Sequence, residues 1–216
     1  MTVQQGSGQP GEPLSNMADH WWWRPGWSVG RRFYTWHLTF ADAAEVRRLA
    51  ARYRAALADV PDLVLVPDRW LHLTMQGIGF VDEVDRGTVD RIVEAARVRL
   101  GRLPAFDITL GPAVLYPEAV LLAAQPAEPV GTVRTAIRNA IRDVLPEVPE
   151  SADGFRPHVS VAYSAGTGAA GPVADALARL GDATASTRVV SAELIVLGRD
   201  QRMYEWDTYR SLPLAS

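Results

Sequence analysis

Two tetrapeptides combine residue types that move protons with residue types that bind phosphate: His72-Leu73-Thr74-Met75 and His158-Val159-Ser160-Val161. Each lies in a stretch typical of a β-strand, where side chains two residues apart point to the same face. The imidazole and the hydroxyl of each tetrapeptide therefore share one face, and the two apolar side chains pack on the other. If the two strands meet, two imidazoles and two hydroxyls converge on one small volume, which suits acid–base chemistry on a phosphodiester.

The paired occurrence is what makes this pattern informative. A single histidine on a strand is more often a structural hydrogen-bonding residue than a catalyst. Two imidazoles with ordinary pKa values of about 6.5 can act together near neutral pH, one as base and one as acid. Thr74 and Ser160 each offer a neutral O–H donor to a non-bridging phosphate oxygen. The sequence does not say which histidine is the base.

The patterns around the tetrapeptides predict that both lie at the same place in a repeated unit. Strand, helix, histidine strand, helix and strand occur in that order twice, which indicates an α+β fold with a weak internal duplication. We expect a single domain over 19–216, with lobes at about 19–111 and 112–216, after a flexible tail at 1–18 rich in Gly, Pro, Gln and Ser. The expected strands, besides the two histidine strands, cover 32–40, 105–110, 119–124, 187–197 and 203–209. The expected helices cover 43–57, 84–100, 130–144 and 171–180.

Composition narrows the function classes. The 216 residues have a net charge of −3, which argues against a strongly electrostatic nucleic-acid binder but allows a local basic patch. The chain has no cysteine, so disulfides, thiolate nucleophiles and cysteine metal clusters are excluded. No standard metal-ligand spacing and no dinucleotide or P-loop glycine motif occurs, and we expect no metal and no cofactor. Neither a membrane-spanning segment nor a signal peptide is apparent, so we expect a cytoplasmic monomer without membrane contact.

With their flanking residues, the tetrapeptides resemble a known family. Trp70 to Gly77 and Phe155 to Tyr163 resemble the two His-x-Ser/Thr-x motifs of the 2H phosphoesterase superfamily, and about 19–210 resembles its bacterial 2'-5' RNA ligase-like (LigT-like) branch. The resemblance implies two α+β lobes related by a pseudo-twofold axis, with antiparallel sheets flanking a central cleft into which both motifs project. It implies no metal, and it carries catalytic roles onto four positions, which are His72, Thr74, His158 and Ser160.

The family's known activities set the expected reaction. We expect metal-independent hydrolysis of a 2',3'-cyclic phosphate on an RNA end or a nucleotide, with 2'-5' RNA ligation as a second activity that the resemblance implies. Two alternatives stay open, namely the same chemistry on a small cyclic phosphate outside RNA, and an RNA- or nucleotide-binding module with little turnover. A substrate panel separates the first alternative, and binding without hydrolysis would support the second.

Four further residues are candidates for substrate contact. His37 begins a third match, His37-Leu38-Thr39-Phe40, and faces the cleft only if its strand pairs beside the His72 strand. By alternation, Gln76 shares the face of His72, whereas Tyr163 falls opposite His158, so that core packing competes with its role as a contact. Many relatives carry an arginine shortly after the second histidine, and Arg156 is the residue here that could supply that charge.

The N-terminal region contains an aromatic cluster of His20, Trp21, Trp22, Trp23 and Trp27. Tryptophan serves both as a stacking platform and as buried cover, and we favour a flap that covers one apolar face, with His20 as a structural residue.

Overall fold

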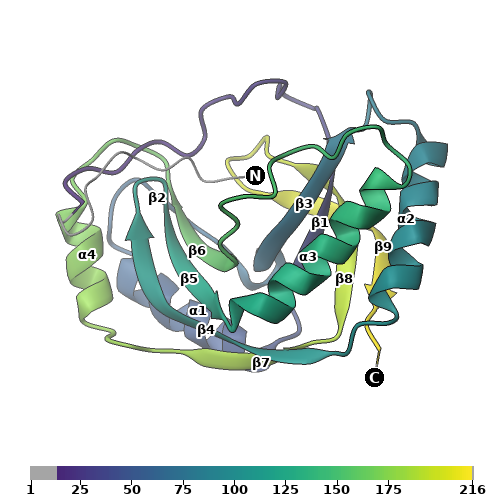
Figure 1. Ribbon diagram of the computed structural model, residues 1–216. Coiled ribbons are helices and arrows are strands. Elements are labelled where there is room, and N and C mark those ends of the chain that lie inside the picture. The colour runs from purple at the N-terminus through teal and green to yellow at the C-terminus, as the bar shows by residue number, and fades with distance from the viewer. Residues whose placement is uncertain (1–13, 216) are drawn as a thin grey trace.

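The computed structural model describes residues 14–215 and contains two antiparallel sheets with helices on the outside (Figure 1). The predicted α+β class with flanking sheets is confirmed. The strands are β1 (Phe33–Thr39), β2 (Leu63–Leu65), β3 (His72–Phe80), β4 (Phe106–Tyr116), β5 (Ala119–Gln125), β6 (His158–Ser164), β7 (Ala185–Val189), β8 (Ser191–Gly198) and β9 (Glu205–Pro213). The helices are α1 (Ala44–Leu57), α2 (Arg86–Leu100), α3 (Ala127–Arg142) and α4 (Gly171–Ala178), with a 3-10 turn at Asp68–Trp70.

The two sheets have matching strand orders. One runs β3-β1-β8-β9, and the other runs β2-β6-β5-β4-β7, so that without β2 each sheet starts with a histidine strand. In each sheet the histidine strand pairs antiparallel with the strand that begins its repeat, β3 with β1 and β6 with β5. The repeat seen in the sequence therefore corresponds to a repeat in the structure, and the two histidine motifs lie on strands with equivalent positions in their sheets.

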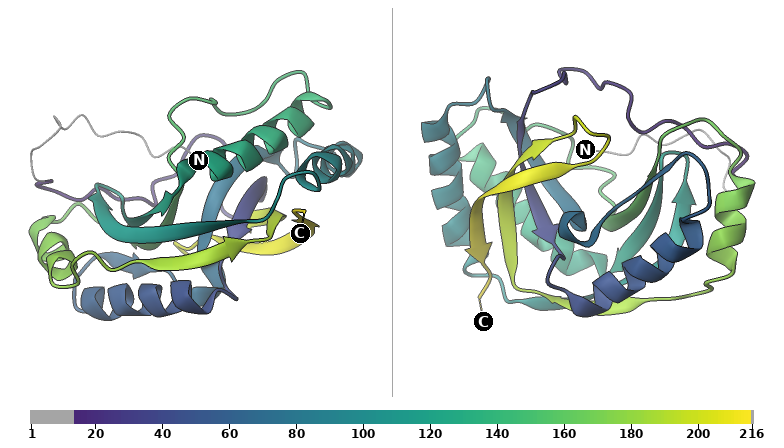
Figure 2. Two further views of the ribbon diagram at one scale, coloured as in Figure 1. Left: turned by 60° about the horizontal axis from the view of Figure 1, so that its bottom comes forward. Right: turned by 180° about the vertical axis from the view of Figure 1, so that it is seen from behind.

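The lobes are not the two halves of the chain. β4, which we expected to close the first lobe, lies in the second sheet, and β8 and β9 return to the first. The helices also exchange: α1 follows β1 but packs on β7, β6 and α4, while α3 follows β5 but packs on α2 and β3. Figures 1 and 2 show α2 and α3 together at one end and α1 and α4 at the other. The lobe boundary near residue 111 was therefore wrong, because pairing between distant strands decides lobe membership.

The same exchange explains two differences in strand boundaries. The expected strand at 187–197 is broken at Val190, since β7 pairs with β4 in one sheet and β8 pairs with β1 in the other. The expected strand at 105–110 continues to Tyr116 through an irregularity at Gly111-Pro112, where β4 shifts its register against β5. Sheet pairing, which is a long-range property, sets both boundaries.

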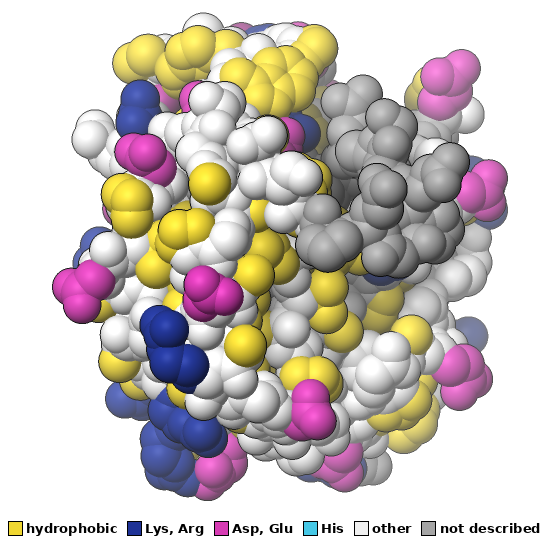
Figure 3. All heavy atoms as spheres, turned by 90° about the vertical axis from the view of Figure 1, so that its left-hand side faces the viewer, with side chains coloured by type: hydrophobic (Ala, Val, Ile, Leu, Met, Phe, Trp, Pro, Cys, Tyr) yellow, Lys and Arg dark blue, Asp and Glu magenta, His cyan; other side chains and the backbone are white. Residues whose placement is uncertain are grey.

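The segment before β1, residues 14–31, crosses the molecule from α4 to β1 and is called the strap below (Figure 1). Its first part belongs to the stretch that we expected to be a flexible tail. Met17 is 6% exposed, and Asn16 forms a β-bridge with Ala169, so residues 14–18 are docked and only 1–13 lie outside the described residues at this end of the chain. The face shown in Figure 3 carries acidic and basic side chains interspersed among hydrophobic ones.

Candidate active site

The two histidine strands meet across the sheets. β3 contacts β6, and the four residues singled out by the tetrapeptides line one cavity of about 50 Å³. These residues are His72, Thr74, His158 and Ser160. The apolar residues between and after them, such as Leu73 and Val159, are fully buried on the core side of each strand. Alternation along the two strands therefore delivers both imidazoles and both hydroxyls to the same place.

Both imidazoles are fixed by the same hydrogen bond. His72 Nδ1–H donates to the carbonyl oxygen of Trp70 at 2.7 Å, and His158 Nδ1–H donates to that of Arg156 at 2.7 Å. A carbonyl only accepts, so Nδ1 carries the proton in each neutral ring and Nε2 keeps its lone pair. The main chain two residues before each histidine thus selects the tautomer that a general base requires.

Burial shifts the titration of both rings. It lowers the pKa of His72 to about 4, where the nearby His158 lowers the pKa further and the bond to Trp70 opposes the shift. Burial also lowers the pKa of His158, against the bond to Arg156. Since desolvation disfavours the charged form, both rings are neutral near pH 7 without substrate. An anionic phosphate in the cavity is the kind of neighbour that favours protonation of one of them.

The lowered pKa of His72 makes the stability of the protein depend on pH. In the unfolded chain His72 binds a proton below about pH 6.5, whereas in the folded chain it binds one only below about pH 4. The free energy of unfolding therefore falls as the pH falls through this range. His72 alone should account for about 2 kcal/mol between pH 7.5 and pH 5. Urea unfolding at both pH values should show a smaller loss for His72→Asn than for the wild type. Equal losses would contradict the shift.

A β-bulge follows each hydroxyl residue. The pairing of β3 with β1 skips Met75, and the pairing of β6 with β5 skips Val161, the fourth residue of each tetrapeptide. Both bulged carbonyl groups have partners, Met75 O from Arg134 Nε at 2.8 Å and Val161 O from the main chain N–H of Val66 at 2.9 Å. An extra residue inverts the alternation of side chains beyond it. Assignments based on strict alternation past Met75 and Val161 therefore fail.

Gln76 is the first such correction. It does not line the cavity but lies fully buried behind β3, where it accepts from Arg138 Nη1 at 2.5 Å and donates to Pro149 O at 2.5 Å. The bulge at Met75 turned its side chain away from the face of His72. Gln76 consequently ties Pro149 and α3 to the histidine strand.

Tyr163 is corrected in the opposite direction. The bulge at Val161 brings its ring to the face of Ser160, where it lines the cavity and is stacked on His20 at 4.4 Å between ring centroids. Burial raises the pKa of its phenol, so the group stays protonated. Tyr163 therefore forms one wall of the site instead of packing on the opposite face.

His37 also faces the cavity. β1 pairs directly with β3, so that His37 stands opposite Thr74 and its ring is stacked on that of His72, 4.3 Å between centroids and 11° between planes. Its Nε2 lies 3.4 Å from Thr74 Oγ1, and the edge of Trp206 packs near both rings. Burial holds the pKa of His37 well below its ordinary value. As a neutral ring, it packs against His72 and lies within hydrogen-bond distance of Thr74.

Arg156 lies beside the cavity in a wider groove. This groove of about 600 Å³ is lined by Tyr116, Phe155 and Arg156, and it shares Thr74 and His158 with the cavity. Arg156 Nη1 lies 3.4 Å from the phenol oxygen of Tyr116. Positive charge and two aromatic rings are therefore available next to the histidines, on the side where Arg156 precedes His158.

Several wall residues of the cavity escaped the sequence analysis as site residues, among them His20, Glu118 and Tyr204. His20 comes from the strap, Glu118 from the turn between β4 and β5, and Tyr204 from the residue before β9. No local motif joins positions so far apart. The aromatic cluster around His20 was the one available signal, and it indicated a cover, which Trp21 provides at 7% exposure, although Trp22 and Trp23 remain 43% and 48% exposed.

Among residues 14–215, no three histidine, aspartate or glutamate side chains are grouped so as to hold a metal ion. Over this described range, no helix is both long and apolar enough to cross a membrane.

Comparisons with known proteins agree with the geometry. The sequence model of the 2'-5' RNA ligase superfamily matches residues 40–201. The crystal structure of TT0787 of Thermus thermophilus is similar at a TM-score of 0.65 and 17% identity, over 85% of this chain and 97% of that chain. Apo LigT of E. coli is similar at a TM-score of 0.61 and 16% identity, over 86% and 99%. LigT complexed with 3'-AMP is similar at a TM-score of 0.64 and 17% identity, over 86% and 99%.

A search of curated proteins finds no match. At these identities the solved structures show a shared fold, and the superfamily model, which spans most of the chain and includes both histidine motifs, shows the family. This protein belongs to the 2'-5' RNA ligase superfamily and shares its fold with LigT.

Proposed function

We propose that the protein is a metal-independent phosphodiesterase that opens 2',3'-cyclic phosphates of RNA ends or nucleotides by paired-histidine acid–base catalysis. The proposal rests on one observation, which is that the rings of His72 and His158 are held in the same way. Each donates Nδ1–H to the carbonyl two residues before it, and both line one cavity with Thr74 and Ser160. Two imidazole rings that keep the lone pair on Nε2 at one phosphate-sized site can serve as general base and general acid.

The reaction follows from these groups. One histidine takes a proton from water through Nε2 as the water oxygen bonds to phosphorus. The bond from phosphorus to the 3'-oxygen breaks, and the other histidine, protonated, gives its proton to that oxygen, which leaves a 2'-phosphate and a free 3'-hydroxyl. Thr74 and Ser160 donate hydrogen bonds to the non-bridging oxygens as charge builds on them. With a 5'-hydroxyl in place of water as the nucleophile, the same two proton transfers would give a 2'-5' linkage.

The groove next to the cavity favours a nucleotide over a small cyclic phosphate. Its volume of about 600 Å³ falls in the range of sites that bury whole small molecules, whereas the histidine cavity alone holds about 50 Å³. Tyr116 and Phe155 offer aromatic faces to a base, and Arg156 offers charge to a further phosphate. LigT, which has the same fold, is known in complexes with 3'-AMP and with ATP.

Phosphorus NMR of the purified protein with 2',3'-cyclic AMP tests the proposal directly. We expect the cyclic phosphate signal to be replaced by that of the 2'-phosphate, at a rate that EDTA leaves unchanged. A 3'-phosphate product would contradict the assignment of the leaving oxygen, and a rate abolished by EDTA would contradict metal independence. Tight binding with no product over long incubation would support the nucleotide-binding alternative instead.

A further inference from the structure

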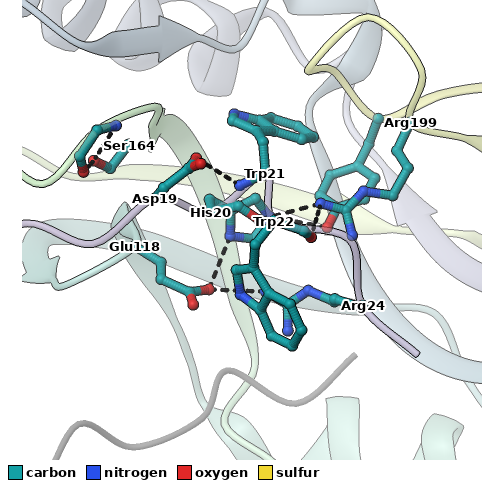
Figure 4. Close-up of polar contacts among 10 residues, drawn as sticks. Asp19, His20, Trp21, Trp22, Arg24, Glu118, Ser164 and Arg199 are labelled. Carbon is teal, nitrogen blue, oxygen red and sulfur yellow. Dashed lines mark hydrogen bonds and ion pairs between the residues drawn. The ribbon is translucent and has the colours of Figure 1, made fainter. Parts of the chain in front are cut away.

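The strap, residues 14–31, lies outside the range 40–201 that matches the superfamily model, yet it is firmly attached to the site. The main chain N–H of His20 donates at 2.9 Å to the carbonyl oxygen of Ser164, the last residue of the second histidine strand. Arg199 Nη2 donates to the carbonyls of His20 at 3.1 Å and Trp22 at 3.2 Å. Figure 4 shows Arg199 reaching the strap from the opposite side to Glu118. Because of these hydrogen bonds, the strap is a fixed part of the cleft.

The strap places His20 in the wall of the catalytic cavity. The ring is 6% exposed, donates Nδ1–H to Glu118 Oε2 at 3.1 Å, and accepts from the Tyr204 hydroxyl at Nε2 at 2.9 Å. Arg24, also on the strap, binds the same Glu118 oxygen at 2.8 Å (Figure 4). His20 is also stacked on Tyr163, so its ring is held on three sides.

The cleft is consequently unequal on the two sides of the histidines. Toward the strap, the cavity of about 50 Å³ has room for roughly three to five water molecules. Its walls there include His20, Tyr163 and Tyr204, none more than 6% exposed, and Glu118, whose side chain is 15% exposed. Away from the strap, it adjoins the groove of about 600 Å³ through Thr74 and His158. One side admits a nucleoside, and the other admits little more than a phosphate and water.

We propose that the strap selects the nucleophile, by closing with His20 the space that a second nucleotide needs and leaving room for water. The proposal rests on the proposed function and adds that the enzyme hydrolyses cyclic phosphates and does not join RNA ends. In joining, the 5'-oxygen bonds to phosphorus, its proton goes to one histidine, and the bond from phosphorus to the 3'-oxygen breaks as the other histidine protonates that oxygen. With one nucleoside in the groove, the second must extend beyond phosphorus, toward His20.

Competition between water and alcohols of different size tests this directly. The purified full chain is incubated with 2',3'-cyclic AMP and either methanol or uridine. The 2'-phosphate and 2'-phosphodiester products are then separated by liquid chromatography and identified by mass spectrometry. For the wild type we expect the methyl ester, and at least 100-fold less transfer to the uridine 5'-hydroxyl at equal concentration. His20→Ala should raise the share transferred to uridine at least tenfold. Val29→Ala, a strap change at a position 77% exposed, should leave this share unchanged.

The outcomes separate the two proposals. Hydrolysis accompanied by transfer to uridine within tenfold of methanol would overturn the role of the strap and leave the proposed function intact. A folded His20→Ala variant with an unchanged share would overturn it as well. The absence of any 2'-phosphate in the wild type would remove the proposed function and this inference with it. If His20→Ala does not fold, the comparison of methanol with uridine in the wild type decides.

Discussion

Replacing either His72 or His158 with alanine is expected to lower kcat/KM for 2',3'-cyclic AMP by about 10³-fold. Each variant loses one of the two groups that carry the proton, and the double variant should be little worse than either single one, because the pair acts as a unit. Initial rates with the cyclic nucleotide measure the effect. Circular dichroism and the Tm confirm that the variants are folded.

Asparagine at the same positions gives a sharper control. His72→Asn keeps a donor for the carbonyl of Trp70 but cannot transfer a proton in this pH range. It should lose activity as severely as His72→Ala while keeping more of the stability. A folded variant of either histidine that retains more than about a tenth of the wild-type kcat/KM would exclude that ring as the acid or the base.

The same variants should separate the two ionisations that shape the pH profile of kcat/KM. Burial lowers the pKa of both rings, so the wild-type maximum is expected below pH 6.5, between two macroscopic values that belong to the pair. The profile should fall on the acid side as the base is protonated and on the alkaline side as the acid loses its proton. In the residual activity of each single variant one limb should disappear, and the missing limb tells which histidine is base and which is acid.

Arg134→Ala is expected to destabilise the protein by about 3–5 kcal/mol and to lower kcat as well. The buried guanidinium donates to the bulged carbonyl of Met75 at 2.8 Å, to Ala152 O at 2.9 Å and to Ser151 O at 2.8 Å. Alanine leaves these acceptors without their partner, and the bulge next to Thr74 loses its support. Urea unfolding and steady-state kinetics measure the two effects.

Arg142 on the same helix is the matched control. It is exposed and donates to Asn139 Oδ1, so Arg142→Ala should change the free energy of unfolding by less than about 0.5 kcal/mol. Arg134→Lys restores one charged donor and should recover part of the kcat. If Arg134→Ala were as stable and as active as Arg142→Ala, the bulge at Met75 would not depend on α3.

Local patterns were enough to find the candidate catalytic pair but not the second ring of residues. His72 and His158 stood out because apolar alternation marks each strand, and that signal lies within four residues. Gln76 and Tyr163 were placed on the wrong faces because the sequence analysis assumed strict alternation along each strand. A bulge depends on how two strands pair, so the pattern of a single strand does not reveal it. His37 could be placed only conditionally, since its position depends on the pairing of β1 with β3.

The predicted elements and the two-sheet architecture were mostly right, while the lobe assigned to several elements was not. Helix patterns indicated α1 and α3 within a few residues, since burial of one face repeats along a helix whatever it packs on. Nothing in the amphipathic pattern of α1 says which sheet covers it. His20 and Tyr204 meet across nearly the whole chain, and residues this distant in sequence are brought together only by the complete fold.

The exchange of α1, α3 and the last two strands between the lobes has a consequence for folding. A chain cut near residue 111 would give two fragments, neither of which contains a complete sheet, because β1 and β3 need β8, and β5 and β6 need β2 and β4. The two lobes therefore form one cooperative folding unit, and heat should melt them in a single calorimetric transition. Unfolding of either sheet would then separate the two histidines in the same step that unfolds the other sheet.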